Sequence, residues 1–113
     1  MKKSLTRRER LRGRTEIRRL FATGKSVERK GIRLLYLKND LSWNRIVVCP
    51  VRGFKKAVAR NREKRLCREA YRSLKHQVAT GYDLAFVLYP GEFSFQDRLR
   101  QIESLLERVG LKR

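Results

Sequence analysis

The chain has 113 residues, the length of one domain, and 41% of them are hydrophobic, which is enough for a packed core and excludes a wholly disordered chain. Thirty lysines and arginines face eleven acidic residues, giving a net charge of +19. This charge is far larger than solubility requires and indicates a polyanionic partner. Nucleic acid fits best, because each neutralised phosphate releases condensed counterions.

Other classes are disfavoured by what the sequence lacks. No stretch is apolar and long enough to span a membrane, and the first five residues carry charge without the apolar run of a secretory signal. Cys49 and Cys67 have no zinc-ligand spacing. We therefore predict a cytoplasmic protein with both thiols in its core.

The N-terminus is predicted to be a basic arm over residues 1–13, poorly ordered without a partner. Its cations are Lys2, Lys3, Arg7, Arg8, Arg10 and Arg12, against the single acid Glu9. A short helix follows, with Thr15 as its cap and Gly24 at its end. Ile17, Leu20 and Phe21 share one face of this helix.

Two strands are predicted next, over residues 32–37 and 45–51. Asn39, Asp40 and Ser42 supply turn chemistry between them, so an antiparallel hairpin is possible. Pro50 lacks a backbone donor and must lie at a strand end or on an edge.

Helical periodicity begins at Lys55 and continues to about Lys75, with an apolar side that Glu63 interrupts. Residues 82–89 are apolar at almost every position and predict a central strand. A last helix begins at Ser94, where Asp97 completes a capping box, and ends at Gly110. The order predicts an α+β domain over residues 1–113, with three helices on a small mixed sheet.

The long helix carries the most informative pattern. Arg60, Lys64, Arg68 and Arg72 form one row at i, i+4 spacing, and Asn61 and Arg65 form the adjacent row. Like charges at this spacing destabilise an isolated helix, so a phosphate-binding face explains them better than a solvated one, which usually mixes the signs. Arginine also matches phosphate oxygens in bidentate fashion.

The segment from Ala57 to Ala70, Ala-Val-Ala-Arg-Asn-Arg-Glu-Lys-Arg-Leu-Cys-Arg-Glu-Ala, resembles the signature helix of the bacterial ribonuclease P protein family. The basic N-terminus, the Arg19-Leu20-Phe21 turn that ends at Gly24, and the Tyr82-Asp83-Leu84 strand also lie where the family has them. The resemblance therefore covers nearly the whole chain. Ile17 departs from it, since the family often has an aromatic residue there, and Lys55 stands in place of a glycine.

The resemblance implies a fold and a role. The expected fold is an α–β sandwich with about four strands and a left-handed βαβ crossover, like domain 2 of ribosomal protein S5. In the family, a catalytic RNA subunit removes the 5′ leader of precursor tRNA with Mg²⁺, which the RNA mainly holds. The protein assists by binding the RNA subunit and the leader, and no obligate protein partner is expected.

The same resemblance implies two sets of site residues. Those expected to face the RNA subunit are Lys56, Arg60, Asn61, Arg62, Lys64, Arg65, Arg68 and Arg72. Those expected to line the leader cleft are Ile17, Phe21 and Tyr36. Phe21 fits a core position of the first helix equally well.

Catalysis by the chain itself is not expected. His76 is the only histidine, and the carboxylates Asp40, Asp83 and Asp97 are too scattered in the sequence to suggest a two-metal site. The alternative interpretation is a ribosomal protein or RNA chaperone, which composition and charge fit equally well. A cationic membrane-active protein fits less well, because the apolar faces are needed for the core.

Overall fold

The computed structural model describes residues 5–113. Nine helices and strands follow one another in this part of the chain. They are η1 (Arg7–Glu9), α1 (Arg14–Thr23), β1 (Lys25–Arg29), β2 (Ile32–Lys38), β3 (Arg45–Pro50), α2 (Ala57–Leu74), η2 (Lys75–Gln77), β4 (Tyr82–Leu88) and α3 (Phe95–Arg108). None of the helices in residues 5–113 has the length and apolar character needed to cross a bilayer.

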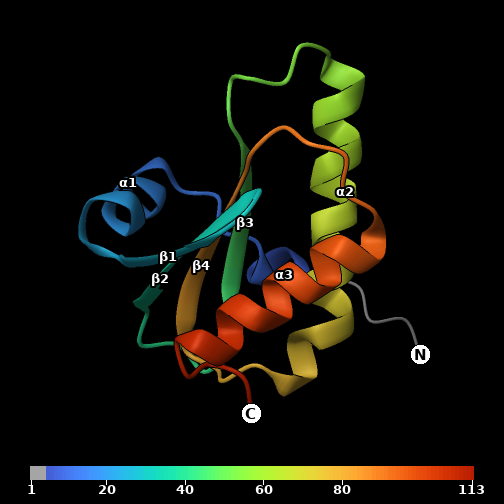
Figure 1. Cartoon of the computed structure of the whole chain (residues 1–113). Coiled ribbons are helices and arrows are strands. Elements are labelled where there is room, and N and C mark those ends of the chain that lie inside the picture. The colour runs from blue at the N-terminus through green and yellow to red at the C-terminus, as the bar shows by residue number, and fades with distance from the viewer. Residues whose placement is uncertain (1–4) are drawn as a thin grey trace.

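The strands form one mixed sheet in the order β1-β2-β4-β3. β4 pairs with β2 in antiparallel and with β3 in parallel orientation. The connection from β3 through α2 to β4 has the expected left-handed crossover (Figure 1). The hairpin that the sequence left possible for β2 and β3 does not form, because β4 lies between them. Six of the seven residues of β4 are buried, which is typical of a central strand with neighbours on both edges.

Strand β1 was missed by the sequence pattern. Its sequence is Lys-Ser-Val-Glu-Arg, and only Val27 is even half-buried. It lies at the edge of the sheet, where its backbone ladder with β2 holds it in place and charged side chains are favoured. The total of four strands agrees with the expected fold.

The helices cover opposite faces of the sheet (Figure 1). α2 and α3 pack on one face with Ile32 and Leu34 of β2, together with Phe86, which is fully buried. α1 packs on the other face through Leu20, against Leu35 and Val87. Because side chains alternate along a strand, this arrangement decides which residues α1 can meet.

The glutamate that interrupts the apolar side of α2 has a partner in α3. The Arg98 guanidinium lies 2.8 Å from the Glu63 carboxylate, and neither side chain is more than 6% exposed. Arg98 also donates to the Gly31 carbonyl at 3.0 Å and lies over the Phe93 ring at 4.4 Å. The pair joins α2, α3 and the β1–β2 turn, so Glu63 belongs to the core as an ion pair.

The helix ends agree with the sequence at two places and differ at one. Ser94 and Asp97 form the predicted capping box of α3, and Gly24 caps the end of α1. α1 begins one residue before Thr15, and its N-cap is Gly13. Thr15 therefore lies within the first turn of the helix, and the prediction that it caps α1 is wrong.

The predicted core is confirmed for Cys67, and burial raises the pKa of its thiol to about 12. Cys49 is only partly buried on β3. Phe95 and Tyr89 have core periodicity in the sequence, but both are half-buried at the margins of the two clusters.

Candidate nucleic-acid interface

Helix α2 separates an apolar side from a cationic one. Cys67, Ala70 and Leu74 are buried against the sheet and α3. The opposite side and the flank beside β3 carry the residues that we call the α2 cationic face. They are Lys56, Arg60, Asn61, Lys64, Arg65 and Arg68. Asn61 and Arg65 are exposed, whereas Arg60, Lys64 and Arg68 are half-buried.

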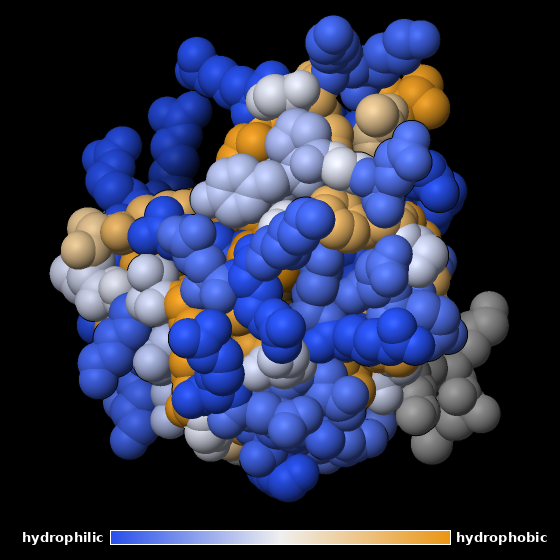
Figure 2. Space-filling model, viewed as in Figure 1, coloured by the Kyte–Doolittle hydropathy of each residue, from blue (hydrophilic) through white to orange (hydrophobic). Residues whose placement is uncertain are grey.

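No acid neutralises this face within residues 5–113. None of the ion pairs within residues 5–113 involves a lysine or arginine of α2. Glu63, the acid nearest the middle of the face in sequence, is turned into the core toward Arg98. Figure 2 shows hydrophilic side chains over most of the molecular face on which α2 and α3 lie. Repulsion among these cations opposes helix formation, and bound phosphates would relieve it.

Two residues predicted for the same RNA-binding set line hollows that residues at the start of α3 also border. Arg62 lines a hollow with Glu92 and Phe93, at the start of α3. Arg72 lines a shallow hollow with Glu69 and Phe95. The structure therefore brings the side chains of Arg62 and Arg72 near the start of α3, although Arg72 continues the i, i+4 row of Arg68 along α2.

The residues predicted for the leader cleft are divided between two faces of the sheet. Ile17 packs against the cluster under α1, and Phe21 of the same helix is 43% exposed, so Phe21 is not a core residue. Tyr36 packs on the opposite face, with the α2–α3 core. Tyr36 therefore cannot line a cleft beside α1. Leu35, one position earlier, occupies that place under α1.

The N-terminal segment, expected to be a flexible arm, has contacts with the rest of the protein in its described part. Lys2 and Lys3 lie outside the described residues, but residues 5–13 lie against the body of the protein. The backbone N–H of Leu11 donates to the Ile46 carbonyl at 2.7 Å, and Leu11 is only 3% exposed. Glu9 pairs with Lys75 at 3.3 Å. Burial would raise the pKa of Glu9, but hydrogen bonds from Thr6 and Lys75 outweigh it, so the pKa lies below its ordinary value.

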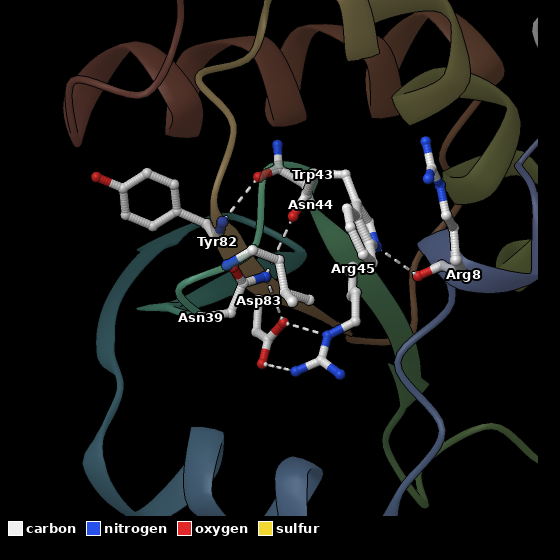
Figure 3. Close-up of polar contacts among 8 residues, drawn as sticks. Arg8, Asn39, Trp43, Asn44, Arg45, Tyr82 and Asp83 are labelled. Atoms are coloured by element: carbon white, nitrogen blue, oxygen red, sulfur yellow. Dashed lines mark hydrogen bonds and ion pairs between the residues drawn. The ribbon is translucent and has the colours of Figure 1, made fainter.

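A cluster at the β2–β3 loop holds this segment and the start of β4 (Figure 3). The Trp43 indole donates to the Arg8 carbonyl at 3.0 Å, and the Arg8 guanidinium lies over the ring at 4.6 Å. Asp83 accepts two 2.8 Å hydrogen bonds from Arg45, which raise the pKa of Arg45. Asp83 is thus a structural carboxylate at the beginning of β4.

The carboxylates form no candidate metal centre. Across residues 5–113, no three His, Cys, Asp or Glu side chains gather as a ligand set. Asp83 is bound to Arg45, Asp97 caps α3, and Asp40 lies exposed in the β2–β3 turn at a φ of 62°. His76 lies exposed in η2.

Comparison with known proteins places these features in one family. The family model described as Ribonuclease P matches residues 5–110. The ribonuclease P protein component of Thermotoga maritima is 38% identical over 87 residues, which cover 77% of this chain and 74% of that protein. The counterpart from Caldanaerobacter subterraneus is 34% identical over 98% of this chain and 95% of its own length.

Solved structures agree with the fold. The ribonuclease P protein from Thermotoga maritima superimposes with a TM-score of 0.80 at 29% identity, covering 88% of this chain and 96% of that one. The protein from Staphylococcus aureus has the same TM-score, 0.80, at 17% identity, and covers 93% and 98% of the two chains. At that lower identity the likeness concerns the fold alone.

Proposed function

The chain belongs to the ribonuclease P protein family, and from this premise we propose that its α2 cationic face binds the catalytic RNA subunit while the α1 side of the sheet holds the 5′ leader of precursor tRNA. As the protein component of ribonuclease P, it serves the endoribonuclease that processes tRNA, and an RNA subunit is its partner. The ribosomal or chaperone alternative is not favoured by these findings.

The observation that carries the RNA-subunit contact is the charge of the α2 cationic face. Arg60, Lys64 and Arg68 follow one another at i, i+4 spacing, and the described part of the chain provides no carboxylate for any of them. RNA phosphates would supply the missing counter-charge and release condensed ions in doing so. Asn61 and Arg65, both exposed, extend the face outward, where Asn61 can contact a base edge or a 2′-hydroxyl.

The proposed leader site rests on α1. Ile17 borders the apolar cluster of Leu35 and Val87, and Phe21 leaves nearly half of its surface open. An exposed aromatic ring beside an apolar sheet face suits unstacked bases, which only a single-stranded leader provides. Tyr36 has no part in this site, since it lies on the other face of the sheet.

Magnesium chemistry is assigned to the RNA partner. Within residues 5–113 no three candidate ligand side chains gather for Mg²⁺, Asp83 and Glu63 are bound by arginines, and Asp97 caps a helix. We propose that the protein contributes charge neutralisation and substrate positioning, in the cytoplasm, while the RNA holds the metal ions.

Replacing Lys64 and Arg65 with alanine tests the RNA-subunit contact. The double variant should bind the RNA subunit more weakly, and the slope of log affinity against log salt should flatten by about two, because two phosphate contacts are lost. The matched control is Lys38→Ala with Arg100→Ala, which removes two exposed cations from other surfaces. Filter binding over a salt series measures both. Equal effects of the two pairs would mean that net charge alone governs binding.

A further inference from the structure

A small hollow lies where the N-terminal segment meets the edge of β3 and α2. Its volume is about 240 Å³, and three arginines line it: Arg10, Arg12 and Arg68. The remaining lining residues are apolar: Leu5, Leu11, Ile46, Val47 and Val48. No acidic residue lines it, in contrast with the hollows beside α3 and η2, which contain Glu92, Asp97 or Glu9. An anion is therefore the favoured occupant.

The two N-terminal arginines are held in position by the backbone. Arg10 forms a parallel bridge with Ile46 and has extended backbone angles, with φ −99° and ψ 125°. In an extended segment, Arg10 and Arg12 lie on the side opposite Leu11, which is buried. The contacts of Arg8 with Trp43 and of Glu9 with Lys75 hold the preceding turn. The segment thus behaves as an additional short strand that carries two cations.

The hollow lies between the two surfaces proposed above. Arg68 belongs to the α2 cationic face, and Ile46 and Val48 point toward the α2 side of the sheet. Val47 and Leu11 belong to the cluster under α1, where Ile17 and Phe21 lie. A strand of RNA that passes from α2 to α1 around the β3 edge of the sheet would meet this hollow.

We propose that Arg10, Arg12 and Arg68 form a phosphate site for the single-stranded 5′ leader, between the RNA-subunit contact and the proposed leader site at α1. This proposal rests on the proposed function and adds residues to it. The small hollow admits the phosphate and ribose of one strand, and its apolar floor favours contact with a ribose or base face. The N-terminal segment then acts as a part of the substrate site.

The test uses a double variant that carries Arg10→Ala and Arg12→Ala. The matched control is a second double variant that carries Arg7→Ala and Lys38→Ala. All four side chains are exposed, and neither control residue lines the hollow. Holoenzyme affinity is measured for precursor tRNA with a leader of several nucleotides and for mature tRNA. The Arg10/Arg12 variant should lose about tenfold in affinity for the precursor only, and its salt slope should fall by about 1.4, or 0.7 for each single-strand phosphate.

Three outcomes would overturn the proposal: an equal loss with the control pair, an equal loss for mature tRNA, or a loss of affinity for the RNA subunit alone. The last would place the arginines on the RNA subunit. The wild-type protein in the same assay separates this proposal from the proposed function. If the wild type binds the RNA subunit and favours precursor over mature tRNA, the function stands whether or not the arginines contribute.

Discussion

Arg98→Ala is expected to destabilise the protein by about 3–5 kcal/mol, because it leaves the Glu63 carboxylate buried without its partner. Arg98 is fully buried and Glu63 is 5% exposed, so water cannot readily replace the lost guanidinium. The variant also removes the hydrogen bonds to the Gly31 carbonyl and the Gln101 side chain. Urea or thermal unfolding of the free protein measures the change.

A double variant separates the ion pair from the packing. Replacing Arg98 with methionine and Glu63 with leucine removes both charges while filling much of the same volume. Apolar replacement of a buried pair is often neutral or stabilising, so the double variant should recover most of the stability. A cost below about 1 kcal/mol for Arg98→Ala, or a double variant as unstable as the single one, would show that the pair does not join α2 to α3 as described.

Phe21→Ala is expected to weaken binding of precursor tRNA by about five- to 150-fold, with little effect on mature tRNA. The reason is that only the precursor has unpaired 5′ nucleotides that can stack on the exposed ring. Affinity for the RNA subunit should hardly change, because the α2 cationic face lies on the other side of the sheet. Holoenzyme affinities for the two tRNA forms give the result.

The matched control for Phe21 is Tyr36→Leu. Tyr36 is a half-buried aromatic residue on the face under α2 and α3, so this change should leave the preference for precursor tRNA unaltered. Unfolding of the free Phe21→Ala protein should show only a small loss, since 43% of the side chain is exposed. Equal weakening for both tRNA forms, or a stability loss typical of a core residue, would move the leader site elsewhere.

Local patterns predicted the elements that depend on burial and capping. The long helix, the central strand β4 and the start of α3 at Ser94 each have a strong periodic or capping signal, and the structure has them where the sequence indicates. β1 has no such signal, because an edge strand with one half-buried valine depends on its backbone ladder with β2. The pairing of the strands could not be predicted either. A short loop between β2 and β3 is compatible with a hairpin, and also with a third strand lying between them.

Some site residues could be placed from local spacing, and others depend on how distant elements pack. Helical spacing is sufficient to gather Arg60, Lys64 and Arg68 on one flank of α2. It could not decide that Arg62 and Arg72 lean toward α3, because that depends on where the third helix packs. Alternation along β2 shows that Tyr36 and Leu35 face opposite ways, but only the position of α1 shows that Leu35 lies under this helix.

The N-terminal arginines were not predicted as site residues because a dense run of cations indicates disorder. The residues that hold the segment in place are distant in sequence. Trp43 reaches the Arg8 carbonyl and Ile46 accepts from Leu11, across separations that no local pattern records. The available signal in the sequence was the alternation Arg10-Leu11-Arg12, which in an extended segment places the leucine on the side opposite the two arginines.

The central claim is that this protein acts with a catalytic RNA through the α2 cationic face. The most direct test is reconstitution with the RNA subunit of the same organism and a precursor tRNA, at a magnesium concentration where the RNA alone cleaves slowly. The wild-type protein should restore removal of the 5′ leader, and the Lys64→Ala/Arg65→Ala variant should need a higher protein concentration to do so. Cleavage at the same rate with and without the protein, or equal activity of the two proteins at every concentration, would contradict the claim.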